Sequence, residues 1–304
     1  MALNDAFHTL LARSLPLVPR PIVRRVSRRY IAGEGLADAV ETVRALNAEG
    51  FMATVDILGE SVHDRALVQR ALDDYREALH AIGQKRLDSN VSIKPTQFGL
   101  KIDFDLCLAS VRALVEEARG LGNFVRIDME DSSCTSATLD LYARLRSEGF
   151  DNVGVVLQAY MRRSLADARA LPPQANVRVC KGIYIEPEDV AFKERDLVNR
   201  NFARMVEELF DRGAYVGIAT HDEEVVYEAQ RLIETRRLPH TAYEFQMLLG
   251  VAETLRKVIR RDGHRLRVYV PYGAEWYAYS LRRLKENPRI AGYILSGLLP
   301  GGGD

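Results

Sequence analysis

The feature that most constrains the fold is a regular alternation of short apolar segments with longer helical ones. Eight segments rich in Val, Ile, Phe and Tyr recur, at residues 51–58, 90–95, 124–130, 152–160, 177–184, 215–222, 243–249 and 265–273. Stretches rich in Ala, Leu, Arg and Glu, which favour helix, lie between them at 62–82, 104–120, 135–148, 188–212, 222–235 and 250–262. Eight strand and helix pairs over about 250 residues predict an α/β fold of the (β/α)8 TIM-barrel type.

A doubly wound sheet also alternates strands with helices. A dinucleotide-binding sheet of that kind carries a GxGxxG turn after an early strand, and the chain has no such turn. The count of eight therefore favours the barrel. With 304 residues, we predict an N-terminal helical arm over 1–45 and a barrel catalytic domain over 46–300.

The N-terminal segment has its own pattern. Five apolar residues at helical spacing, Leu3, Phe7, Leu10, Leu11 and Leu15, predict an amphipathic helix over 3–17. Four arginines follow it, at Arg24, Arg25, Arg28 and Arg29. We favour a helix that packs on the main body with a solvated arginine face, and a peripheral contact with a membrane surface or a partner is the alternative.

Composition narrows the partners and the compartment. Lys and Arg together number 42, as do Asp and Glu, so no net charge attracts the chain to nucleic acid. The three cysteines, Cys107, Cys134 and Cys180, form no CxxC pair, which fits a reducing compartment. No apolar run approaches the roughly 20 residues of a membrane-spanning helix, and we expect no signal peptide. These observations predict a cytoplasmic protein.

Polar residues close almost every predicted strand. Active sites of such barrels lie at the carboxyl ends of the strands, so we expect these side chains to converge. They are Asp56, Glu60, Lys94, Asp128, Glu130, Gln158, Arg178, Lys181, Thr220, His221, Glu244, Gln246 and Tyr269.

Three of these residues, Lys94, Arg178 and Lys181, are cations that would face one mouth of the barrel. Cations in that position suit a carboxylate or phosphate ligand, so we expect an anionic ligand. The carboxylates expected to hold these cations are Asp56, Glu60 and Asp128.

Other chemistries stay open at this point. A metal is less favoured, because Asp128, Glu130 and His221 offer only one imidazole. A lyase or aldolase could use Lys94 or Lys181 to form a Schiff base if the pKa of that lysine is depressed. A barrel that binds an anion without turnover is the third alternative.

The segment WYAYSLRRLKENP follows the last predicted strand. Helical spacing brings Tyr279, Arg282, Arg283 and Glu286 onto one broad face. A surface helix with an Arg282 to Glu286 ion pair is the simpler interpretation. The segment nevertheless lies where a barrel places anion-binding elements, which favours a role in the site.

Eight segments, in order along the chain, resemble the proline dehydrogenase family. They are SIKP at 92–95, RIDME at 126–130, VVLQAY at 155–160, VRVCKGIY at 177–184, IATHD at 218–222, FQMLLG at 245–250, RVYVPYG at 267–273 and YSLRRLKEN at 279–287. We expect the short, monofunctional bacterial type. The resemblance implies FAD inside a distorted barrel, oxidation of L-proline to Δ1-pyrroline-5-carboxylate, and a membrane quinone as electron acceptor. It also implies pyrroline-5-carboxylate dehydrogenase as a functional partner.

The resemblance also implies roles for individual residues. Residues expected at the catalytic centre are Lys94, Tyr269, Tyr279, Asp128, Arg282, Arg283 and Glu60, the last as a gate partner of Arg282. Lys94, Arg282 and Arg283 would hold the substrate carboxylate, and the walls over the proline ring would be Tyr184, Leu248, Tyr269 and Tyr279. Positions that match the flavin site are Asp128, Gln158, Arg178, Val179, Lys181, Gly182, Thr220, His221 and Glu286.

Two positions depart from the family pattern. Ile183 stands where the family usually has a small residue, and Cys180 stands where it usually has an apolar β-branched one. We favour a tolerated repacking at Ile183. A narrower pocket with a different preference, for example for hydroxyproline, is the alternative.

Overall fold

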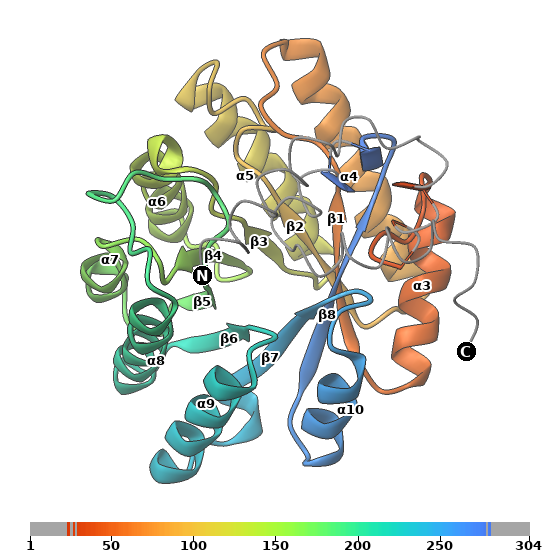
Figure 1. Cartoon of the computed structure of the whole chain (residues 1–304). Helices are drawn as coiled ribbons and strands as arrows, with labels where there is room; N and C mark the ends of the chain where they lie inside the picture. The colour runs from red at the N-terminus through yellow and green to blue at the C-terminus, as the bar shows by residue number, and fades with distance from the viewer. Residues whose placement is uncertain (1–22, 25–26, 28, 278, 281–304) are drawn as a thin grey trace.

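The computed structural model describes residues 23–24, 27, 29–277 and 279–280. Its eight parallel strands close into one barrel in the order β1 to β8 (Figure 1). The strands are β1 (Met52–Ile57), β2 (Ser89–Ile93), β3 (Val125–Ile127), β4 (Val153–Gln158), β5 (Asn176–Cys180), β6 (Tyr215–Ala219), β7 (Tyr243–Leu248) and β8 (Leu266–Tyr272). Each lies within or next to one of the eight predicted segments, so the predicted barrel is confirmed.

Helices surround the barrel (Figure 1). They are α3 (Leu36–Ala48), α4 (Arg65–Gln84), α5 (Phe104–Gly120), α6 (Ser132–Ser147), α7 (Ser164–Ala170), α8 (Arg195–Asp211), α9 (Glu223–Arg236) and α10 (Glu253–Arg261), with a 3-10 turn, η2 (His240–Ala242), before β7. The six predicted helical stretches correspond to α4, α5, α6, α8, α9 and α10. Helix α7 was not predicted, because seven residues are too few to show a helical period.

Aspartates begin four of these helices. The side chains of Asp64, Asp103, Asp131 and Asp222 each accept a hydrogen bond from a backbone N–H in the first turn of α4, α5, α6 and α9. Such a cap satisfies a backbone donor that has no partner within the helix. These residues therefore fix where the helix begins after each loop at the carboxyl end of a strand.

Side chains of opposite character alternate along the strands. In β3, Val125 and Ile127 belong to the apolar core, whereas Arg126 between them bonds to β4 and β5. Successive side chains of a strand point to opposite faces, so the apolar layer lies between barrel and helices. The barrel interior is consequently lined with polar side chains. This arrangement places charged groups where strands from opposite sides of the barrel meet.

Helix α3 covers the seam at which the barrel closes, because it packs against β1 and β8. The boundary predicted between residues 45 and 46 falls inside this helix. Just before α3, the N–H of Ala32 donates to the carbonyl of Pro271 at 2.9 Å. The expected helix over 3–17 and the residues Arg25 and Arg28 lie outside the described part of the chain, while Arg24 pairs with Glu34 at 3.0 Å.

No helix in the described part of the chain combines the length and the apolar character needed to cross a membrane.

Candidate active site

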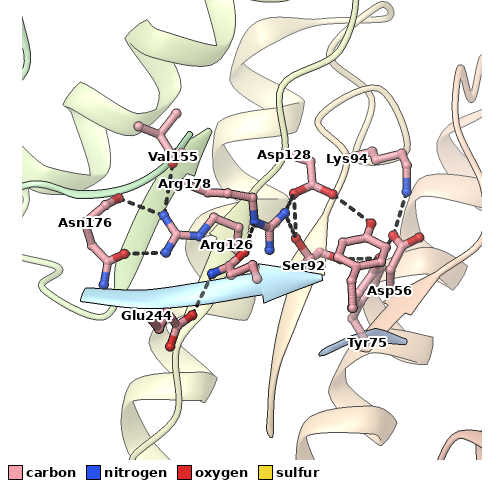
Figure 2. A network of polar contacts seen from close by, with 12 residues as sticks. Asp56, Tyr75, Ser92, Lys94, Arg126, Asp128, Val155, Asn176, Arg178 and Glu244 are labelled. Atoms are coloured by element: carbon pink, nitrogen blue, oxygen red, sulfur yellow. Dashed lines mark hydrogen bonds and ion pairs between the residues drawn. The ribbon is translucent and has the colours of Figure 1, made fainter. Parts of the chain in front are cut away.

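The polar contacts of the barrel interior converge on Asp128, the residue that follows β3. One oxygen of its carboxylate accepts from Arg178 of β5 at 2.6 Å and from the hydroxyl of Ser92 of β2 at 2.6 Å (Figure 2). Arg178 also reaches Ser92 at 3.3 Å. Strands β2 and β5 are not neighbours, so these contacts cross the interior and hold the Arg178 guanidinium in one place.

Tyr269 of β8 completes this cluster. Its hydroxyl donates to the second oxygen of Asp128 at 2.9 Å, and its ring centroid lies 5.3 Å from the guanidinium carbon of Arg178. Burial, reinforced by the charges of Asp128 and Asp56, raises the pKa of Tyr269 well above its ordinary value. The phenol is therefore neutral at physiological pH and acts as a hydrogen-bond donor.

A second ion pair lies beside the first. Lys94, just after β2, donates to Asp56 of β1 at 2.6 Å, and the Asp56 side chain is fully buried. Burial lowers the pKa of Lys94, but the attraction of Asp56 and Asp128 outweighs it and raises that pKa overall. A Schiff-base lysine needs a depressed pKa. The electrostatics therefore disfavour Lys94 as an imine-forming nucleophile.

Tyr75 of α4 bonds to the backbone of the two strands, β1 and β2, that carry or adjoin this pair. Its hydroxyl donates to the carbonyl of Ser92 at 2.7 Å and accepts from the N–H of Ile57 at 3.1 Å. A helix thus locks the carboxyl ends of β1 and β2 together (Figure 2).

The loop after β3 is held by a buried carboxylate. Glu130 accepts from both the N–H and the hydroxyl of Thr96, at 2.9 and 2.6 Å, and its carbonyl accepts from the amide of Gln158 at 2.7 Å. Burial raises the pKa of Glu130, although the bonds from Thr96 oppose that shift. These contacts place Gln158 at the carboxyl end of β4, next to β5.

The predicted cofactor residues of β5 and β6 form the opposite side of the mouth. Lys181 donates to Asp222 at 2.5 Å, and Arg195 donates to the same oxygen at 2.6 Å. The imidazole Nε2 of His221 accepts from the N–H of Leu248 at 2.9 Å. This bond fixes the ring beside the end of β7 and leaves Nδ1 to carry the proton of a neutral imidazole.

Gly182 shapes the start of the loop after β5. Its φ of +105° lies in a backbone region that residues with a side chain avoid, and an added Cβ would fall 2.1 Å from the ring of Tyr160. Only glycine fits between the backbone and that ring. Beside it, Val179 contributes its side chain to the apolar core, so only its backbone can face a ligand in the interior.

Not every predicted site residue joins this cluster. Glu60 and Ile183 are exposed, and the Tyr184 side chain is partly buried on the same loop as Ile183. Tyr279 is buried against Ile31 and Leu58. Arg282, Arg283 and Glu286 lie outside the described residues. Asp56 and Asp128 pair with Lys94 and Arg178, as expected of these carboxylates. Lys181 pairs with Asp222, a carboxylate that the sequence analysis did not propose as a partner of the cations.

Several polar residues of the barrel strands, and one of helix α4, were missed by the sequence reasoning. Polar residues that close a strand were chosen, whereas these lie within the strands or on a helix. For the strand residues the signal was present, because they occupy alternate positions between apolar residues, as in Leu-Arg-Val at 266–268, whereas Tyr75 lies on α4. They are Tyr75, Ser92, Arg126, Asn176, Tyr215 and Arg267.

Comparisons with known proteins show the family to which the chain belongs. Residues 39–294 match the family model of proline dehydrogenase. The chain belongs to the proline dehydrogenase family. The proline dehydrogenase of Deinococcus radiodurans is 35% identical over 300 residues, which cover 94% of this chain and 97% of that protein. Proline dehydrogenase 1 of Bacillus subtilis strain 168 is 35% identical over 274 residues, which cover 90% of this chain and 90% of that protein.

Solved structures similar to this proline dehydrogenase family member share its fold. Proline utilization A from Bdellovibrio bacteriovorus, inactivated by N-propargylglycine, has a TM-score of 0.82 and 24% identity. The matched region covers 90% of this chain and 34% of that one. The chain thus spans about a third of the length of that larger protein.

Proposed function

We propose that this protein oxidises L-proline to Δ1-pyrroline-5-carboxylate with FAD as hydride acceptor, the first step of proline catabolism. The observation that carries the proposal is the largely buried cluster of Arg178, Asp128, Tyr269 and Lys94 at the carboxyl ends of the strands, in a chain of this family. It supplies fixed cations and a neutral phenol, the groups that an amino acid and a flavin require of a protein.

The residues of β4 to β6 fit a flavin. Gln158, Arg178 and Lys181 offer amide and cationic donors on two adjacent strands, and Gly182 lets the backbone pass where a Cβ would collide. Such donors suit an isoalloxazine edge and a pyrophosphate. FAD bound here would supply the hydride-accepting ring. Asp128, Thr220, His221 and the backbone of Val179 complete the proposed set, together with Glu286.

On the substrate side, Lys94 would bind the proline carboxylate with Arg282 and Arg283. Two guanidiniums and an ammonium hold a carboxylate in one pose, which makes the transfer step nearly unimolecular. Asp56 keeps Lys94 extended and charged. Tyr269, Tyr279, Tyr184 and Leu248 would form the walls over the ring, and the Arg282 to Glu60 contact would close the site.

In the proposed reaction a hydride passes to the flavin from the ring carbon that adjoins nitrogen and does not carry the carboxylate. A proton leaves the nitrogen, and a C=N bond forms between these two atoms. Electrons then pass to a membrane quinone, so we propose a cytoplasmic protein that contacts the membrane peripherally. The product is unstable and is consumed by pyrroline-5-carboxylate dehydrogenase, its functional partner. We propose that Ile183, whose side chain is exposed, is a tolerated repacking that leaves this specificity unchanged, and a preference for hydroxyproline is the alternative.

Turnover with L-proline and a soluble quinone tests the proposal. We expect Δ1-pyrroline-5-carboxylate, detected by mass spectrometry, to form in step with quinone reduction. Treatment with borohydride and a 2-oxo acid such as pyruvate distinguishes the lyase alternative, because reduction of an imine between its ketone and Lys94 or Lys181 would add mass to the protein. Such a trapped adduct, in a protein that reduces no quinone with L-proline, would contradict the proposed oxidation.

A further inference from the structure

A chain of polar contacts runs beneath Arg178, away from the mouth of the barrel. The Nε of Arg178 donates to the side-chain oxygen of Gln246 at 2.5 Å, and the amide nitrogen of Gln246 donates to Glu244 at 2.6 Å. Glu244 in turn accepts from Arg267 at 2.7 and 3.1 Å and from the hydroxyl of Tyr215 at 2.7 Å.

The direction of every bond in this chain is fixed. If the Gln246 amide turned over, its NH2 group would meet the N–H of Arg178 and its oxygen would meet the carboxylate of Glu244. Both contacts would be repulsive. The ionised Glu244 therefore sets the orientation of Gln246, and Gln246 sets the position of Arg178.

The interposed amide has an electrostatic consequence. A carboxylate in direct contact with the Nε of Arg178 would neutralise part of its charge. Here the charge of Glu244 is balanced by Arg267, and only a neutral oxygen touches that nitrogen. Asp128 already pairs with this guanidinium at 2.6 Å, and the interposed amide keeps Glu244 from adding a second carboxylate contact. Arg178 is thus held rigidly and keeps part of its positive charge toward groups at the mouth.

Gly217 makes space for this chain of polar contacts. It lies beside Arg178 in the register of β5 with β6 and beside Glu244 in the register of β6 with β7. A Cβ at this position would fall 2.6 Å from the amide nitrogen of Gln246. Any larger residue would push Gln246 from its place between its two partners.

We propose that Glu244 and Gln246 are positioning residues that act through Arg178 on the flavin, with Gly217 providing the space they occupy. This inference rests on the proposed function, because it assigns Arg178 to stabilise negative charge as the flavin is reduced. Neither Glu244 nor Gln246 needs to touch flavin or substrate.

The test compares two variants with a control in the purified flavin-loaded protein. Gln246→Met keeps the side-chain length but removes the acceptor and the donor. Gly217→Ala displaces Gln246 and removes no polar group. Val216→Ala, on the same strand but in the apolar layer outside the barrel, controls for lost stability alone. The readouts are the flavin reduction potential, measured against an indicator dye, and kcat/KM for L-proline.

We expect Gln246→Met and Gly217→Ala to retain flavin, to lower kcat/KM about 10- to 100-fold and to lower the potential. The dye equilibrium should move roughly tenfold, which corresponds to about 30 mV for two electrons. Val216→Ala should lower the melting temperature and leave the potential unchanged.

An unchanged potential and kcat/KM in both Gln246→Met and Gly217→Ala would overturn the inference, and if one of these variants fails to fold the other decides. A wild-type protein that turns over no proline would contradict the proposed function instead.

Discussion

Individual residues decide which chemistry the site can perform. Asp128 joins Arg178, Ser92 and Tyr269, and Asp56 holds Lys94. Each carboxylate lies beside a buried cation, so neither is free to act as a general base without breaking an ion pair. In the proposed function the site therefore binds and orients an anionic substrate, and the hydride chemistry would be left to the cofactor.

At the same scale, Arg283→Met tests substrate binding. Loss of a charge-assisted bond to the proline carboxylate should raise KM for L-proline about 10- to 100-fold. Flavin should stay bound, because Arg283 is assigned to the substrate alone. Steady-state kinetics and the flavin absorbance of the purified variant measure both. Loss of flavin with an unchanged KM would show that the assignment is wrong.

The pH dependence of kcat/KM is also a residue-scale prediction. Proline must have a neutral amine to release hydride, so the rate should rise with pH, about tenfold per unit below the amine pKa. The pKa values of Lys94 and Tyr269 are both raised, which keeps their charge states constant through neutral pH. A single ascending limb from pH 6 to 9 is expected. A flat profile would count against this mechanism.

At the scale of elements, sequence reasoning located all eight strands and most helices, because apolar β-branched runs and helical periods are local signals. It did not identify α3 as part of the barrel wall, since only packing against β1 and β8 shows that. Likewise the polar interior escaped notice. Alternation with apolar neighbours places Arg126 and Arg267 on the face opposite the apolar layer, but the sequence does not show which residues they meet across the barrel.

Glu244 links three of these elements and should govern acid stability. It contacts Tyr215 of β6 and Arg267 of β8, and Arg267 also bonds to the carbonyl of Ala53 in β1. Burial alone would raise the pKa of Glu244. The charge and hydrogen bonds of Arg267 outweigh that effect and lower the pKa from its ordinary 4.5 to about 2. The stabilisation is fully present above pH 4.5 and is lost as the pH falls toward 2, on the order of 3 kcal/mol.

Urea unfolding of Glu244→Gln between pH 7 and pH 3 measures this contribution. The variant should be less stable at pH 7 by about 3 kcal/mol or more, because a buried guanidinium loses its partner. Its stability should also fall less steeply with acid than that of the wild type. Glu208→Gln, which removes a surface partner of Arg169, is the control and should change little. Parallel acid limbs in wild type and Glu244→Gln would contradict the account.

For the whole molecule, the balanced total of 42 positive and 42 negative residues gives no information on where these charges lie relative to one another. Opposite charges meet inside one barrel, where Arg178, Arg267 and Lys94 each face a carboxylate. Such a polar interior, unlike the packed apolar interior typical of TIM barrels, suits the proposed binding of a flavin and an amino acid above it. The family assignment and the geometry therefore point to one function.

The most direct test of that function is the absorbance of the purified protein under anaerobic conditions. We predict a yellow protein with a flavin spectrum that bleaches when L-proline is added and recovers when a quinone follows. D-proline serves as the matched control and should bleach it far more slowly, because its carboxylate would point away from Lys94. A colourless protein, or a flavin spectrum that L-proline leaves unchanged, would contradict the account.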